Sequence, residues 1–162
     1  VGQASNLVIL QDHSTVPLTS AKREASLQAI RRLRDQSLRR IVFSTWPRRA
    51  GHRLYAQAGM PRNPAEMIDL IKSHYQSVPK SDPRATSPLK VAPVSQAWEM
   101  ASDLNLHGPD GYHANPSGAW LAALVLAMSA GLAPEMPIAP SNIKYAGRLL
   151  QIARSVTGQT PE

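Results

Sequence analysis

The segment DGYHANPSGAW, residues 110–120, places an aspartate three residues before a histidine and just ahead of a predicted helix. In a helix-like turn, side chains three residues apart can point the same way. A carboxylate bound to one imidazole nitrogen fixes the tautomer and stabilises the imidazolium that forms when the other nitrogen takes a proton. Asp110 and His113 are therefore candidates for the acid and base of a serine hydrolase. The alternative is that they only cap and solvate the loop, because a bare D-x-x-H motif often matches by chance.

A candidate nucleophile within the chain lies in the sequence Asp12-His13-Ser14. Adjacent side chains of an extended chain point to opposite faces, so these residues cannot form a triad unless the chain turns after Gln11. A hydrogen bond in a turn, or at the rim of the site, is the predicted role of Ser14.

A cluster of basic residues follows the second predicted strand and comprises Arg48, Arg49, His52 and Arg53. The whole chain has a formal net charge of +7, which favours acidic partners. The cluster either captures an anionic ligand, with Arg48, Arg49 and His52 as candidate binding residues, or forms a solvated loop. Aromatic residues that could stack on bases make up only 5% of the chain, so no nucleic-acid partner is predicted.

No metal and no other cofactor is predicted. The chain has no cysteine, and His74 and His107 have no ligand partners at a recognisable spacing. The glycines of AGHRLYAQAG, residues 50–59, do not form the G-x-G-x-x-G pattern of a nucleotide-binding turn.

The composition is that of a single globular domain. The chain has 162 residues, of which 43% are hydrophobic and 18% are charged, and this length suffices for a sizeable core. The longest apolar run, residues 119–133, is interrupted by Ser129 and Gly131 and is too short to span a bilayer. A buried helix is predicted there, and no membrane span is expected.

Three predicted strands alternate with helices. The aliphatic and β-branched segments predict strands at 6–11, 40–46 and 89–95. Helical periodicity and Asn-Pro starts predict helices at 19–39, from Pro64 onward, and at 96–103, 117–131 and 143–156. This alternation indicates right-handed crossovers and a parallel sheet. Ligand sites of such sheets lie beyond the carboxyl ends of the strands, where residues 11–14 and 45–53 fall.

Four segments, in order, resemble the SGNH (GDSL-like) hydrolases, and together they cover roughly residues 6–131. They are NLVILQDHSTVPLT, IVFSTWPR, VAPVSQAWEMA and the D-x-x-H block with its small-residue-rich helix. The resemblance implies a three-layer α/β/α flavodoxin-like fold acting on small esters or acylated carbohydrates, with Asp110 and His113 as the acid and base. It also implies that Trp46 lines the substrate cleft. The family uses a side-chain amide in its oxyanion hole, and Gln11 is the nearest amide at that strand end.

The sequence departs from the family in one respect. The family's nucleophilic serine lies in a G-D-S or G-N-S turn upstream of the four segments, and neither that turn nor the glycine donor of the second block occurs in this chain. We therefore expect the chain to be the C-terminal part of a hydrolase. Its partner would be an N-terminal segment of the same gene product. Without the family's nucleophile strand beside it, the strand at 6–11 would be an exposed apolar edge.

Two functions follow as hypotheses. The first is an ester hydrolase whose serine comes from upstream, with residues 1–133 as the hydrolase-like domain and residues 134–162 as a proline-rich linker and a helix that packs on it. The second is a non-catalytic binding module on the same fold, which would hold an anionic glycan or another acidic ligand.

Overall fold

The computed structural model describes residues 7–32, 39–78, 89–132 and 139–159, and these contain a parallel three-stranded sheet. The strands are β1 (Leu7–Gln11), β2 (Arg39–Phe43) and β3 (Lys90–Ala92). Their order is β1-β2-β3, so β2 pairs with both neighbours in parallel.

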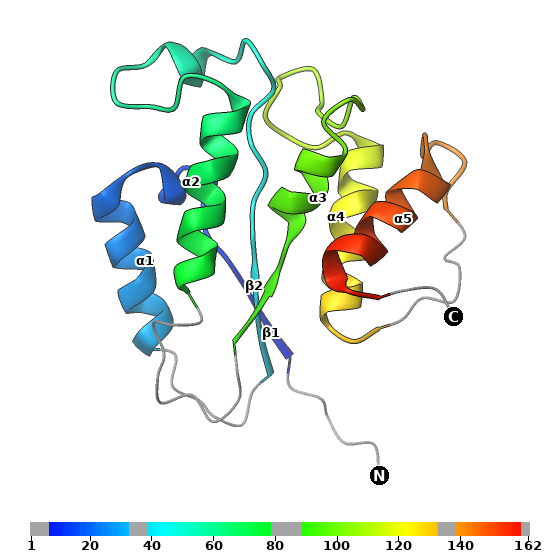
Figure 1. The fold of residues 1–162 in the computed structure, drawn as a ribbon, viewed down its shortest axis with the longest axis horizontal. Coiled ribbons are helices and arrows are strands. Elements are labelled where there is room, and N and C mark those ends of the chain that lie inside the picture. The colour runs from blue at the N-terminus through cyan, green and yellow to red at the C-terminus, as the bar shows by residue number, and fades with distance from the viewer. Residues whose placement is uncertain (1–6, 33–38, 79–88, 133–138, 160–162) are drawn as a thin grey trace.

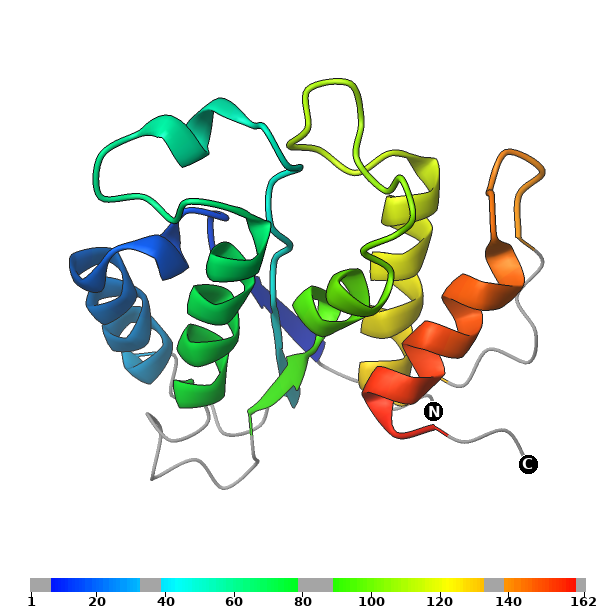
Figure 2. The same ribbon diagram turned by 45° about the horizontal axis from the view of Figure 1, so that its top comes forward.

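Helices cover both faces of this sheet. The helices are α1 (Ser20–Arg32), α2 (Pro64–Ser77), α3 (Val94–Met100), α4 (Pro116–Ser129) and α5 (Ala146–Thr157), with short 3-10 turns η1 (Val16–Leu18) and η2 (Arg53–Ala56). Helices α1 and α2 lie on one side and α3, α4 and α5 on the other (Figures 1 and 2). The predicted three-layer α/β/α architecture with a parallel sheet is therefore confirmed.

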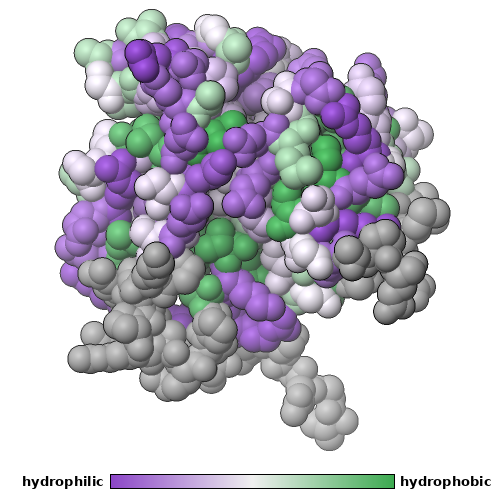
Figure 3. All heavy atoms as spheres, viewed as in Figure 1, coloured by the Kyte–Doolittle hydropathy of each residue, from purple (hydrophilic) through white to green (hydrophobic). Residues whose placement is uncertain are grey.

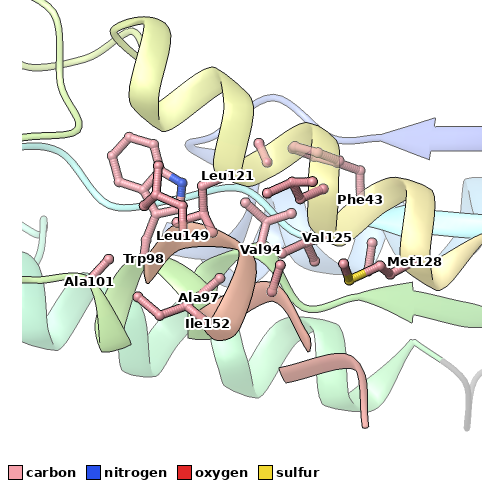
Figure 4. Packing of buried hydrophobic residues seen from close by; sticks show 14 of the residues in the cluster. Phe43, Val94, Ala97, Trp98, Ala101, Leu121, Val125, Met128, Leu149 and Ile152 are labelled. Carbon is pink, nitrogen blue, oxygen red and sulfur yellow. The ribbon is translucent and has the colours of Figure 1, made fainter. Parts of the chain in front are cut away.

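The alternation of side chains along β2 divides the core in two. Ile41 and Phe43 point toward α3, α4 and α5, whereas Val42 points toward α1 and α2. In the first core, Trp98 packs with apolar residues of α4 and α5 (Figure 4). Leu149 of α5 is fully buried there, so α5 is part of the same core as α4.

Prolines account for both Asn-Pro helix starts and for one strand end. Asn63 and Asn115 accept hydrogen bonds from the backbone N–H of residues Glu66 and Gly118, so α2 and α4 begin where the sequence predicts. The third strand is shorter than predicted and ends at Ala92, and α3 begins directly after Pro93. Proline has no backbone N–H to continue the ladder, which explains this early end.

Strand β1 is only partly covered. It pairs with β2 alone among the described strands, and Ile9 is 47% exposed. The aliphatic run by itself suggests a strand buried on both faces, which Ile9 contradicts, whereas its exposure agrees with the expectation of an exposed apolar edge. Parts of other predicted segments lie outside the described residues, namely the end of the first helix at 33–38, the loop at 79–88 and most of the linker at 133–138.

Within the described residues, no helix has the length and apolar character needed to cross a membrane. The apolar run that begins at residue 119 instead forms most of α4, whose Leu121, Leu124 and Val125 are buried in the first core.

Candidate active site

The side chains of Asp110 and His113 face each other in the loop that precedes α4. Nδ1 of His113 lies 2.6 Å from Oδ2 of Asp110. The other carboxylate oxygen, Oδ1, accepts hydrogen bonds from the backbone N–H groups of Tyr112 (2.9 Å) and His113 (3.0 Å). The loop backbone thus holds the carboxylate with its Oδ2 toward the imidazole.

These contacts keep the Asp110 carboxylate ionised and set the tautomer of the neutral His113 ring. The backbone N–H of Tyr112 and the His113 side chain together hold the pKa of Asp110 well below its usual range. An ionised carboxylate only accepts hydrogen bonds, so Nδ1 of His113 donates and the neutral ring carries its lone pair on Nε2. The His113 side chain is 68% exposed, and its Nε2 makes no hydrogen bond with a described residue. This nitrogen can accept a proton from a group brought to it.

The loop from residue 106 to residue 115 is closed on itself. His107 and Ala114 form an antiparallel bridge, and Gly108 N–H donates to the carbonyl of His113 at 2.8 Å. Asn115 N–H donates to the carbonyl of Leu106 at 2.9 Å, directly before α4. The position of His113 is therefore tied to the start of a helix that is buried in the core.

The segment after β2, which contains Trp46, Pro47 and Arg49, forms hydrogen bonds with this loop. The indole N–H of Trp46 donates to the carbonyl of Tyr112 at 3.1 Å, and Nε2 of His107 donates to the carbonyl of Pro47 at 2.9 Å. Arg49 N–H donates to the carbonyl of Gly111 at 2.8 Å. Burial lowers the pKa of His107, which favours the neutral ring whose Nε2 carries the proton.

Two of the candidate residues from the sequence, Trp46 and Arg48, lie in the segment after β2 that holds the loop. Trp46 stacks on Trp98 with 4.8 Å between ring centroids and 6° between planes, and it is half-buried. Arg48 is only 5% exposed, which differs from the solvated loop that was one interpretation of this cluster. Its guanidinium lies 3.8 Å from the centroid of the Tyr112 ring, and burial lowers its pKa.

The same arginine connects the loop to the end of β1. Nη2 of Arg48 donates to the hydroxyl of Ser14 at 2.7 Å. The neighbouring His13 instead pairs through Nδ1 with the hydroxyl of Thr15 at 2.9 Å. No described histidine hydrogen-bonds to Ser14, so the residues Asp12-His13-Ser14 do not form a triad in this structure.

A separate Asp–His–Ser set lies beside β1. Asp12 accepts hydrogen bonds from the hydroxyl of Ser26 at 2.8 Å and from Nε2 of His74 at 3.1 Å. The carboxylate stands between the other two groups, whereas a catalytic triad places the histidine there. The set joins β1 to α1 and α2. Gln11, the amide proposed for the oxyanion hole, is exposed and lines a small pocket of about 140 Å³ next to Asp12.

A second, larger pocket of about 400 Å³ lies beside the Asp110 loop. Arg49, His52 and Arg53 line it together with residues 110–112. Arg48 does not line this pocket. Nδ1 of His52 accepts a hydrogen bond from Leu54 N–H at 3.1 Å, and burial followed by the charges of Arg48 and Arg53 lowers the pKa of His52.

Comparison with known proteins gives structural relatives. No protein-family model and no curated protein matches the sequence. The fold is similar to a solved structure described as "a putative SGNH hydrolase from Slackia heliotrinireducens", with a TM-score of 0.64 and 26% identity over 78% of this chain and 66% of that one. It is also similar to a DUF4886 family protein from Bacteroides uniformis, with a TM-score of 0.65 and 18% identity over 97% of this chain and 64% of that one. This chain has an SGNH-like fold. It spans about two thirds of the length of each of these two proteins.

Within this SGNH-like fold, the sequence did not predict two residues at the candidate site. Tyr112 accepts the Trp46 hydrogen bond at its carbonyl and lies against the Arg48 guanidinium, and its ring centroid lies 3.9 Å from that of His113. Gly111 was also not predicted, whereas Arg53 belonged to the predicted basic cluster but not to its candidate binding residues. The position of Gly111 between the aspartate and the histidine was the signal for a tight turn, because glycine readily adopts positive φ.

Gly111 provides a test of how the loop is held. Its φ is +66°, and an added Cβ would lie 3.2 Å from Cβ and 3.3 Å from Nε of Arg49. Gly51 has a similar φ of +78° but open space around it. We expect Gly111→Ala to lower the thermal unfolding temperature more than Gly51→Ala, since both variants carry the backbone strain of about 1–2 kcal/mol but only the first displaces Arg49. Equal losses in the two variants would show that the Arg49 contact does not constrain the loop.

Proposed function

We propose that this chain supplies the acid–base pair of an SGNH-type ester hydrolase, whose nucleophilic serine lies in an upstream segment of the same gene product. The observation that carries the proposal is the 2.6 Å contact between His113 Nδ1 and the Asp110 carboxylate, with Nε2 of the imidazole left for a substrate or nucleophile. The similarity to the Slackia heliotrinireducens protein supports the hydrolase class.

The place of the pair in the fold also supports the proposal. Ligand sites of parallel α/β sheets lie beyond the carboxyl ends of the strands. The loops after β2 and before α4, which carry the basic cluster and the Asp110–His113 pair, both lie at the upper end of the molecule in Figure 1 and come forward in Figure 2. His113 is exposed at this end, where the proposal places the upstream serine.

In the proposed reaction, His113 Nε2 takes the proton of the serine hydroxyl as its oxygen attacks the ester carbonyl. The imidazolium then gives this proton to the leaving alcohol as the acyl–oxygen bond breaks. A water molecule hydrolyses the acyl-enzyme with the same base, which returns the serine and releases the acid. Asp110 stabilises the imidazolium in each half, and Gln11 is the proposed amide donor to the oxyanion.

The substrate proposed for this reaction is a small ester or an acylated carbohydrate, as in the hydrolases that the sequence resembles. No separate cofactor is needed, because the reaction proceeds by proton transfer and nucleophilic attack alone.

The proposal predicts that esterase activity requires the upstream segment. The complete gene product should hydrolyse 4-nitrophenyl acetate with turnover and should be labelled covalently at one upstream serine by a fluorophosphonate. Residues 1–162 alone should show neither, since no imidazole nitrogen of the described residues hydrogen-bonds to a serine hydroxyl. The measurements are nitrophenolate release and mass spectrometry of the labelled peptide. Absence of both signals from the complete product would contradict the proposal and would leave the binding-module hypothesis.

A further inference from the structure

The pocket beside the Asp110 loop is lined by more cationic side chains than anionic ones. It is lined by residues 49–53 of the loop after β2 and residues 110–112 of the loop before α4, and its volume is about 400 Å³. Arg49 and Arg53 form no ion pair with any described carboxylate. Hydrophilic residues cover much of the surface near the loops at this end on the face drawn in Figure 3.

Some cations elsewhere on the described surface are paired with acids. Arg62 lies beside Glu66, Lys72 beside Glu99, and Arg148 beside Asp103. Exposed ion pairs of this kind contribute little to stability. Arg49 and Arg53 differ from these three cations in forming no ion pair with a described carboxylate, which leaves their charges for a ligand.

The side chains around the pocket offer donors. Nη2 of Arg49 donates to the carbonyl of Pro109 at 3.2 Å, which fixes its guanidinium along the loop and leaves its other N–H groups. Arg53 is exposed, and its side chain makes no hydrogen bond with a described residue. Nδ1 of His52 accepts from Leu54, so the neutral ring carries its proton on Nε2 as a further donor.

Asp110 also lines this pocket, but both of its carboxylate oxygens already have hydrogen-bond partners within the loop. Its Oδ1 accepts two backbone N–H groups, and its Oδ2 lies against His113. The buried cation of Arg48 lies behind the same loop, under the ring of Tyr112. An anion in the pocket would therefore find cationic and neutral donors on the side of Arg49, His52 and Arg53, with the charge of Asp110 directed toward the imidazole.

We propose that this pocket binds an anionic group of the substrate, a carboxylate, phosphate or sulfate, so that the hydrolase prefers acidic esters over neutral ones. The pocket reaches the catalytic pair through Asp110, one hydrogen bond from His113. A substrate whose anion lies in the pocket would have its ester close to the imidazole. This inference rests on the proposed esterase function, and Arg53 replaces the buried Arg48 among the predicted ligand-binding residues.

Paired substrates test the preference. The complete gene product is assayed with neutral 4-nitrophenyl acetate, with the 4-nitrophenyl hemiester of succinate, and with 4-acetoxybenzoate, so that the carboxylate stands on the acyl side or on the alcohol side. We expect a higher kcat/KM for at least one acidic ester, relative to its neutral counterpart (4-nitrophenyl acetate for the hemiester, methyl 4-acetoxybenzoate for 4-acetoxybenzoate), and a preference that weakens as salt is added. Arg53→Gln should reduce this ratio by about fivefold, the effect of losing one exposed charge pair.

The matched control is Arg32→Gln. Arg32 is also exposed, but it is the last residue of α1, which runs away from the loops of the site (Figure 1). This variant should keep the wild-type ratio. If Arg53→Gln and Arg32→Gln both leave the ratio of each acidic ester to its neutral counterpart unchanged, the proposal is wrong.

A second measurement does not depend on turnover. Glutarate is titrated into the His113→Ala variant of the complete product, and amide chemical shifts are followed by NMR. Shifts at residues 49–53 and 110–112, lost when Arg53→Gln is added, support the anion site even if the wild type hydrolyses no ester, an outcome that would refute the proposed function alone. Ester turnover without charge preference and without these shifts would refute the anion site alone.

Discussion

Replacing His113 by alanine in the complete gene product is expected to lower kcat for 4-nitrophenyl acetate by roughly 10⁴-fold or more, as is typical when a serine hydrolase loses its base. The physical reason is that the serine proton then has no acceptor, and the leaving alcohol has no donor. Substrate binding is affected less, because the His113 side chain is 68% exposed and lies against the exposed loop residue Asp110 and the ring of Tyr112 rather than in the core. The check is steady-state kinetics, with kcat and KM determined separately.

Asp110→Asn is a second variant of the pair, for which we expect a smaller loss of kcat than for His113→Ala. The amide keeps the size of the side chain but removes the charge that stabilises the imidazolium, so we expect a fall in kcat of roughly 10²–10⁴. Because the pKa of Asp110 is depressed, its carboxylate stays ionised as the pH falls to about 3.9, the ordinary value for aspartate. The wild-type rate above that pH should therefore show no acidic limb due to Asp110.

His13→Ala is the control, since His13 is also exposed and lies at the carboxyl end of β1. It should retain the wild-type kcat. Retention of more than about a tenth of the wild-type rate by His113→Ala would mean that the base lies elsewhere, and the assignment of the pair would fail.

The features that the sequence predicts correctly are those set by neighbouring residues. The strands around Val8 and Ile41 follow from runs of β-branched and aliphatic residues, and the starts of α2 and α4 follow from Asn-Pro dipeptides. The contact between Asp110 and His113 was also predictable from the local sequence, because a separation of three residues within one turn suffices to bring the two side chains together.

Long-range packing decides what the sequence could not show. Arg48 follows a strand end in a run of basic residues, which is typical of a solvated loop, yet it is buried by Tyr112 and Ser14, which lie 64 residues after it and 34 residues before it. The hydrogen bond from Trp46 to the Tyr112 carbonyl joins two loops that no local pattern connects. The two candidate reacting groups, Asp110 and His113, are therefore neighbours in the sequence, whereas the residues that hold their loop in place are distant from it in the sequence.

Gly118→Ala is expected to lower the free energy of unfolding by about 2–4 kcal/mol, because a Cβ at this position overpacks the core. The added atom would clash with the carbonyl oxygen of Leu106 and would lie 2.9 Å from the ring of Trp98. Neither neighbour can yield easily, since one is backbone and the other is buried. Helix propensity alone predicts the opposite sign, a gain of up to about 1 kcal/mol for alanine in α4.

Thermal unfolding distinguishes the two effects, with Gly147→Ala in α5 as the matched control. Nothing lies within 4 Å of a Cβ at Gly147, so this variant should unfold at the wild-type temperature or above. Gly118→Ala should unfold about 5–15 °C lower. The carbonyl of Leu106 also accepts the Asn115 hydrogen bond that closes the loop of His113, so the same variant should lose esterase activity below its unfolding temperature. Unchanged stability in Gly118→Ala would show that α4 does not approach the loop as closely as the structure places it.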